Sequence, residues 1–153
     1  MRTRRHVVAF AAIIAGFALA SCEADLLGTG GGDPDVASMR VTVASQQITI
    51  NESGQVTGAP GVLHAGVAAS VTAVFLDAGG QGATGVTPGT YQLNVSVPGG
   101  ASIVFQRSTT NPFAGSLTGS VNGTNAQLRF SLYNIETQRD VFGPADVAFV
   151  VTN

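Results

Sequence analysis

The chain has 153 residues, a formal net charge of −2 and a single cysteine. One cysteine excludes an intrachain disulfide framework and a multi-cysteine metal site, and a charge near zero without clustered basic residues excludes a nucleic-acid-binding footprint. All seven basic residues are arginine, which excludes lysine chemistry such as a Schiff base or a P-loop. The length allows one domain, or one domain with a tail.

The chain begins with a leader. Residues 1–6 carry three arginines and no acid, and residues 7–20 are apolar without a charge. Such a run is too short to span a membrane, which takes about 20 residues. A basic start followed by a short apolar run is typical of a secretory signal peptide, which we expect to be helical.

The leader closes with four residues that carry a specific signal: Leu19, Ala20, Ser21 and Cys22. They resemble the lipobox of bacterial lipoprotein precursors, in which small residues let the backbone enter a peptidase site and the thiol accepts a diacylglyceryl group. The resemblance implies a signal peptide over 1–21 and lipidation of Cys22, with two or three acyl chains that hold the protein firmly on a membrane. The alternatives are ordinary cleavage after an A-x-A pattern, which would leave a free thiol, and an uncleaved anchor.

Two further features of the sequence concern the export pathway and the membrane to which the protein is delivered. In some Gram-negative bacteria an Asp after the lipidated Cys retains lipoproteins in the inner membrane; Glu23 stands at that position here, which favours the outer membrane. Arg4 and Arg5 form a loose twin-arginine export motif, for which a plain basic leader is the simpler interpretation.

A tether follows. Residues 23–35 contain four acids, four glycines and one proline, a composition that buries little apolar surface and stays flexible. We therefore expect a lipidated Cys and a flexible tether over 22–35. Asp33 and Asp35 are candidate calcium ligands, but Pro34 between them and the lack of a loop ligand pattern disfavour such a site.

Residues 36–153 alternate between apolar and polar with period two, which predicts half-buried strands. The predicted inward faces are Met39, Val41 and Val43; Ile48 and Ile50; Val67, Ala69, Val71, Ala73 and Phe75; Tyr91, Leu93, Val95 and Val97; Ile103 and Phe105; Leu117 and Val121; Leu128, Phe130 and Leu132; and Val147, Phe149 and Val151. The switch from odd to even positions over 45–47 predicts a turn or bulge, and Asn122-Gly123 predicts a tight turn.

Glycine- and proline-rich breakers separate these runs, at 58–61, 79–85, 88–89, 98–100, 111–112 and 143–144. No stretch after residue 22 has helical periodicity of useful length. Seven to nine short strands with frequent turns predict an all-β domain, an antiparallel β-sandwich over 36–153.

Residues 64–86 resemble bacterial immunoglobulin-like domains, through Ala65-Gly66, Val71-Thr72-Ala73 and Asp77-Ala78-Gly79-Gly80. The Trp common on the next strand of such domains and the cysteine pair of antibody domains are absent. The resemblance implies an immunoglobulin-like sandwich that serves as an extracytoplasmic spacer or adhesive module, since such domains seldom carry catalysis.

Catalytic candidates are few. His64 is the only histidine after the leader, and a triad of Ser70, His64 and Asp77 has no G-x-S-x-G elbow to support it. The carboxylates of Glu136, Asp140 and Asp146 suit acid–base chemistry or calcium, but we expect them in a solvated loop between the last two strands. We therefore predict no catalytic residue, no metal and no cofactor.

Binding candidates are equally sparse. Arg107, Arg129 and Arg139 could line an anion patch, but their spacing scatters them over separate strands and loops. Carbohydrate binding favours exposed aromatic platforms; the sequence has no Trp and only Tyr91 and Tyr133. The strand faces are rich in Ser, Thr, Asn and Gln, which guard poorly against edge pairing. This indicates either partner binding by strand addition or a compositional habit of the source genome.

The sequence thus predicts a membrane-anchored extracytoplasmic lipoprotein, not an enzyme, whose sandwich binds a protein or cell-surface polymer or is structural. The alternative is a periplasmic lipoprotein that binds a small ligand or a metal. A pocket that gathers His64, Asp77 or the 140–146 segment would favour the alternative, and a long uncovered edge strand would favour the first hypothesis.

Overall fold

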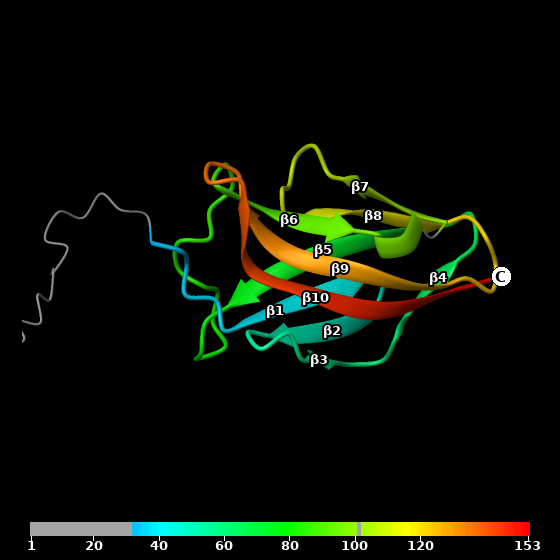
Figure 1. Ribbon diagram of the computed structural model, residues 1–153, viewed down its shortest axis with the longest axis horizontal. Coiled ribbons are helices and arrows are strands. Elements are labelled where there is room, and N and C mark those ends of the chain that lie inside the picture. The colour runs from blue at the N-terminus through cyan, green and yellow to red at the C-terminus, as the bar shows by residue number, and fades with distance from the viewer. Residues whose placement is uncertain (1–31, 101) are drawn as a thin grey trace, which may run out of the picture. The chain divides into compact units, whose positions relative to one another are not determined.

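The computed structural model describes residues 32–100 and 102–153, and strands dominate them (Figure 1). The predicted signal peptide, the lipobox with Cys22 and the tether up to residue 31 lie outside the described residues. The strands are β1 (Ser38–Val43), β2 (Gln46–Asn51), β3 (Val56–Thr57), β4 (Gly61–His64), β5 (Ala68–Leu76), β6 (Tyr91–Ser96), β7 (Ile103–Arg107), β8 (Ala114–Gly119), β9 (Asn125–Asn134) and β10 (Arg139–Thr152), with one 3₁₀ turn at Pro98–Gly100.

The strands form two sheets. The six-stranded sheet has the order β3-β2-β1-β5-β8-β7, and the four-stranded sheet has the order β4-β10-β9-β6. Neighbouring strands run antiparallel, except that β4 runs parallel to β10. The prediction of an all-β, mainly antiparallel domain is confirmed, and the two layers are consistent with the predicted β-sandwich.

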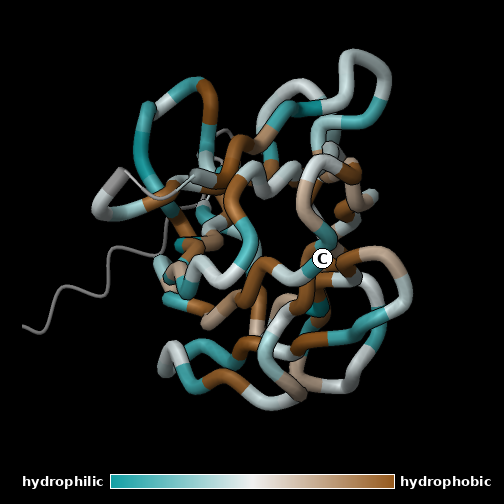
Figure 2. The backbone as a smooth tube through the Cα atoms, turned by 90° about the vertical axis from the view of Figure 1, so that its right-hand side faces the viewer, coloured by the Kyte–Doolittle hydropathy of each residue, from teal (hydrophilic) through white to brown (hydrophobic). Residues whose placement is uncertain are grey.

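One hydrophobic core lies between the layers. Hydrophobic and hydrophilic residues alternate along much of the chain (Figure 2). Met39 of β1 and Leu128 of β9, which come from the two different sheets, belong to the same buried cluster. The rings of Phe130 and Phe149 pack inside it with their centroids 6.2 Å apart. Burying an aliphatic or phenylalanine side chain contributes about 1.5–3 kcal/mol, so this cluster holds the two sheets together.

The place of β4 depends on a glycine. Gly61 pairs with Phe149 of β10, and a Cβ at this position would overlap the Phe149 ring. Only glycine therefore lets β4 lie directly against β10. The interpretation of 58–61 as a plain breaker was wrong at Gly61, which begins β4. The total of ten strands consequently exceeds the expected seven to nine.

The expected break at 143–144 was also wrong, because β10 runs through it. The register of β10 against β9 shifts between Asp140 and Phe142 and again between Phe142 and Ala145, which is the signature of a bulge. Gly143 supplies the positive φ of 83° that this bulge requires. The bulge keeps the alternation inward, with Phe142 and Ala145 both buried.

Period two fails where strands end. Val67 and Val121 are 57% and 51% exposed, although both were predicted to point inward. Each lies just outside a strand, where the pleat no longer fixes the side-chain direction. The two predicted turns are confirmed: Val43 pairs with Gln46 across a hairpin, and Gly123 adopts a φ of 78°.

Residues 32–153 form a compact unit with its own core. Ser131 and Asn134 are the buried polar side chains among the described residues, and no buried side-chain polar atom there lacks a hydrogen-bond partner. A hydrophobic core of this size, whose buried polar side chains are all hydrogen-bonded, is sufficient for independent folding.

The described residues contain no helix with the length and apolar character needed to cross a membrane.

Candidate functional site

The residues of the candidate triad do not come together. Ser70 lies on β5 and Asp77 directly follows the same strand. Seven residues of extended chain separate them by roughly 23 Å at about 3.3 Å per residue. The Asp77 carboxylate instead accepts the Gln81 N–H at 2.9 Å and shapes the turn after β5. His64 lies on β4, in the other sheet. Its Nδ1 atom is 2.9 Å from the carbonyl oxygen of Asn153.

The three carboxylates of the last hairpin are also separate. Asp140 and Asp146 lie on β10, so the expectation that they share a loop with Glu136 was wrong for both. The reason is the bulge, which extends β10 back to Arg139. Asp140 accepts a hydrogen bond from the buried Ser131 hydroxyl at 2.6 Å. Within residues 32–100 and 102–153, no group of three or more His, Cys, Asp and Glu side chains could hold a metal ion.

Asp146 forms an ion pair with Arg129, its register partner on β9. The guanidinium donates from Nε to Oδ1 at 2.8 Å and from Nη2 to Oδ2 at 3.1 Å. The hydrogen bond from Arg129 is the largest effect and lowers the pKa of Asp146. Desolvation opposes it, and the coulombic attraction of Arg129 adds a smaller lowering effect. The same hydrogen bond and charge raise the pKa of Arg129. Both side chains are largely exposed, so the pair contributes little to stability.

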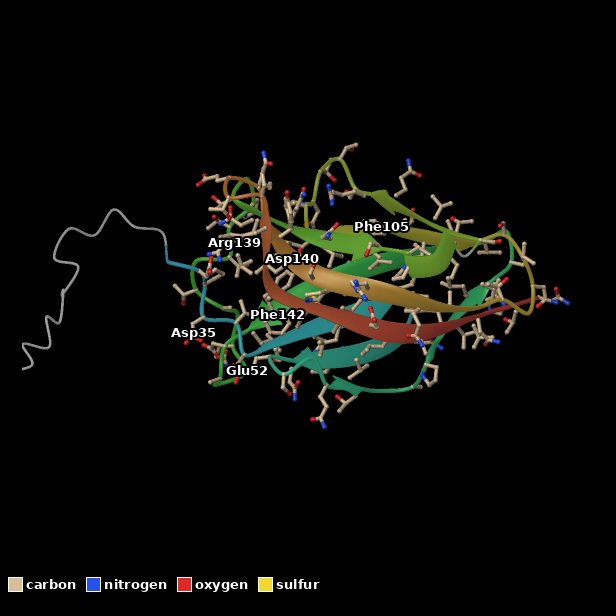
Figure 3. All side chains as sticks on the ribbon, viewed as in Figure 1. Asp35, Glu52, Phe105, Arg139, Asp140 and Phe142 are labelled. Carbon is tan, nitrogen blue, oxygen red and sulfur yellow. The ribbon has the colours of Figure 1, made fainter. Side chains whose placement is uncertain are left out.

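The arginines do not form an anion patch. Arg129 is paired with Asp146, and Arg139 donates to the Asp33 carboxylate at 2.6 Å. Arg107 lies on the other sheet, where its Nη2 donates to the backbone carbonyl oxygen of Leu93 at 3.1 Å. Figure 3 shows Arg139 and Asp140 at the end of the domain near Asp35, with Phe105 further along, on β7.

The tyrosines do not form a sugar-binding platform. Tyr91 is 5% exposed and belongs to the core. Tyr133 is half-buried within β9. Neither ring therefore presents the open face that stacking on a carbohydrate needs.

Several hollows lie on the described surface. One, of about 460 Å³, lies over β5, β7 and β8 and is lined mostly by small and polar side chains, among them Ser70, Thr72, Gln106, Arg107, Ser108 and Ser116. Two others, of about 290 and 280 Å³, lie beside Pro60 and around Phe113. His64, Asp77 and Asp140 line none of these three; Asp146 lines the second, where its carboxylate is already paired with Arg129.

Three of the four sheet edges are short or closed along at least part of their length. At the β4 edge, the Val62 N–H donates to Gln46 Oε1 at 2.7 Å, and the His64 carbonyl accepts the Val67 N–H at 3.0 Å. The β3 edge consists of two residues, Val56 and Thr57, and a short edge strand is itself a guard against pairing.

The β6 edge is closed at Tyr91 and Leu93, and Leu93 is engaged by groups of the other sheet. The backbone N–H of Ile135 donates to the Thr90 carbonyl oxygen, so the backbone groups of even-numbered β6 residues bond to β9. The backbone N–H and C=O groups of the odd-numbered residues therefore point away from β9, toward the open side of the strand. Outward-facing Leu93 is engaged on both backbone atoms: its N–H donates to Pro112 at 2.9 Å, and its carbonyl accepts from Arg107. Outward-facing Tyr91 donates to Thr87 at 3.0 Å.

The β7 edge is open. Ser120 donates to Ser102 and Ser108 donates to Ala114, so even-numbered residues of β7 bond to β8. The backbone N–H and C=O groups of the odd-numbered residues therefore face outward: Ile103, Phe105 and Arg107. Within the part of the chain that the structure describes, no hydrogen bond engages these outward groups. This open row is the candidate interaction site of the domain.

Sequence reasoning missed the residues that close the other edges. Gln46, Arg107 and Pro112 act on backbone atoms of distant strands, and side-chain patterns carry no signal for a backbone partner. The general indication of poorly guarded edges pointed to the right kind of surface without naming β7.

Comparison of the chain with protein-family models, with curated protein sequences and with solved structures finds no match.

Proposed function

We propose that the chain is a bacterial lipoprotein, anchored by lipid on Cys22, whose sandwich domain is a non-catalytic binding or structural module outside the cytoplasm. The anchor is supported by the basic start, the short apolar run and the four residues Leu19, Ala20, Ser21 and Cys22. The open β7 edge is the observation that carries the binding role, because an unpaired strand is a template for another strand.

The proposed domain is immunoglobulin-like, and strand order supports this. In the seven-stranded constant-type fold, strands A, B, E and D form one sheet and strands C, F and G form the other. The order β1-β5-β8-β7 follows the first sheet, and β6-β9-β10 follows the second. The β2–β3 segment then extends the first sheet beyond strand A, and β4 adds a parallel strand beside β10.

A non-catalytic role is supported by where the reactive side chains lie. Ser70 and Asp77 are at opposite ends of β5, and Arg129 and Asp146 use their charges on each other. The small-ligand alternative has less support, because the hollow over β5, β7 and β8 contains none of His64, Asp77 or Asp140, and Asp146 beside Pro60 is already paired with Arg129.

The proposed destination is the outer membrane. Glu23 follows the proposed lipidated residue in place of the Asp that favours inner-membrane retention. The two or three acyl chains of a lipoprotein hold firmly without a spanning segment, since each buried methylene contributes about 0.8 kcal/mol.

Metabolic labelling with a fatty-acid analogue tests the anchor. The wild-type chain should incorporate the label and fractionate with membranes, and Cys22→Ala should lose both properties. Ser21→Ala is the matched control, since it changes the adjacent residue but keeps a small side chain before the cysteine. Equal labelling of wild type and Cys22→Ala, or equal release into the soluble fraction, would refute lipidation.

A further inference from the structure

The sequence of β7 suits it to pairing. Ile103, Val104 and Phe105 are strong strand formers, the strand contains no proline, and Arg107 at its end is its only charge. Val104 is 67% exposed, more than the other large apolar side chains of the described surface. Natural edge strands are commonly guarded by an inward-pointing charge, a proline, a bulge or a covering loop. In β7 the one such feature is Arg107 at the end of the strand, whose guanidinium reaches Leu93 of the other sheet; Ile103 and Phe105 have none.

The outward row of β7 is self-complementary. Its open groups belong to residues 103, 105 and 107. An antiparallel strand with a two-fold axis through residue 105 pairs odd positions with odd positions, so Phe105 faces its own copy and Ile103 faces Arg107. Each facing pair can exchange both of its backbone hydrogen bonds. A second copy of β7 thus supplies a donor for every open acceptor and an acceptor for every open donor.

We propose that the β7 edge binds the β7 edge of a second copy of this chain, in antiparallel register about Phe105, and joins the two six-stranded sheets into one. This inference rests on the proposed binding role and names its partner. Because Arg107 and Pro112 engage the outward backbone groups of Leu93 on β6, β7 has the longer open row of backbone groups on this side of the domain. The symmetric interface is isologous, as in most homodimers.

Charge and side-chain placement fit this partner. In the proposed register the two Arg107 residues lie at opposite ends of the new strand pair, roughly 13 Å apart along the strands at about 3.3 Å per residue. Their repulsion is then largely screened at physiological salt. On the exposed face, Val104 of one copy lies opposite Gln106 of the other, so an apolar side chain contacts an uncharged polar one.

The register can be tested with charges, because it places position 104 opposite position 106. Val104→Lys combined with Gln106→Lys puts like charges opposite each other on both sides of the axis. Val104→Lys combined with Gln106→Glu puts opposite charges there. Both side chains are exposed, so neither double variant disturbs the core. Val74→Lys is the matched control: Val74 is an exposed valine of the same sheet, on the interior strand β5.

Sedimentation analysis of residues 32–153 over a wide concentration range gives the readout. Wild type, Val74→Lys and the Lys/Glu variant should form dimers. The Lys/Lys variant should dimerise at least about tenfold more weakly, which corresponds to about 1.4 kcal/mol. Hydrogen exchange should show the Phe105 amide becoming protected as the dimer forms.

Three outcomes would overturn the proposal: a wild type that stays monomeric at the highest concentration, a Lys/Lys variant that dimerises like wild type, or a monomeric β7 edge that accepts only an unrelated extended peptide. The last outcome would keep the binding role and remove the second copy as partner. Lipidation is tested by separate labelling, so a failed dimer and a failed anchor are distinguishable.

Discussion

The edge strands β6 and β7 border the same side of the domain, yet only β6 is closed over part of its length. On β6 the outward groups of Leu93 are taken by Pro112 and Arg107, whereas the outward groups of β7 have no such partner in the described structure. β6 has no charged residue and β7 has only Arg107 at its end, so charges on the strands do not explain why β6 is the more closed of the two. The difference teaches that edge protection in this domain comes from backbone-directed contacts of a neighbouring loop.

The largest expected effect contrasts the side chains of these two strands. Leu93 is fully buried and Val104 is mostly exposed. Leu93→Ala should lower the free energy of unfolding by about 2–5 kcal/mol, because it leaves a cavity in the core. Val104→Ala should change it by less than about 0.5 kcal/mol. Urea unfolding of residues 32–153 measures both, and equal losses would show that β7 packs more tightly than its exposure indicates.

A smaller effect is expected beneath β7. A Cβ at Gly115 of β8 would lie 2.5 Å from the Phe105 ring and 2.6 Å from the Gln106 carbonyl oxygen. Gly115→Ala should therefore push β7 outward and cost about 1–3 kcal/mol, as overpacking does. Gly54→Ala is the comparison variant. Gly54 has a φ of 76° and open space around it, so a loss of stability there comes from backbone strain and not from steric overlap. Thermal unfolding compares the two. An unchanged Gly115→Ala melting temperature would contradict the close packing of β7 on β8.

The loop that closes β6 can be loosened at Asn111. Its side-chain oxygen accepts the Phe113 N–H at 2.9 Å, which fixes the turn that carries Pro112. Asn111→Ala should lower stability by about 1 kcal/mol and speed hydrogen exchange at the Leu93 amide. Exchange at the Phe105 amide of the monomer should not change, because no loop covers it. Slow exchange at Leu93 in Asn111→Ala would mean that Pro112 does not depend on this turn.

The smallest effect is expected at the Arg129–Asp146 pair, which joins strands that are already paired. Arg129 depresses the pKa of Asp146 in the folded state, so the stabilisation is complete above the ordinary aspartate pKa of about 3.9. It is lost as pH falls through the lower folded pKa. Asp146→Asn should melt slightly below wild type at neutral pH, and the gap should close in strong acid. Arg129→Met should show the same pH dependence of its melting temperature. A difference in melting temperature from wild type that persists in strong acid would exclude the ion pair as its cause.

Period two predicted the inner faces where a strand has paired neighbours on both sides, as for Met39 on β1 and Phe130 on β9. The interpretation of glycines as breakers failed at Gly61 and Gly143, because Gly61 makes room for the Phe149 ring and Gly143 adopts the positive φ of a bulge within β10. For the candidate site, the sequence predicted poorly guarded strand edges in general but not which edge is open. Which edge stays open is decided by contacts such as Arg107 to Leu93, where one partner is a backbone atom with no sequence signature.

The parallel pairing of β4 with β10 has a kinetic consequence. It aligns residues 61–64 with residues 149–152, and β10 also forms the partner of β9 along most of its length. The four-stranded sheet therefore cannot be completed until nearly all of the chain to Thr152 is available. Pairings of such large sequence separation make the contact order high, and high contact order slows folding. We expect folding of residues 32–153 on a time scale of milliseconds to seconds, with closure of the sheet by β10 as a late step.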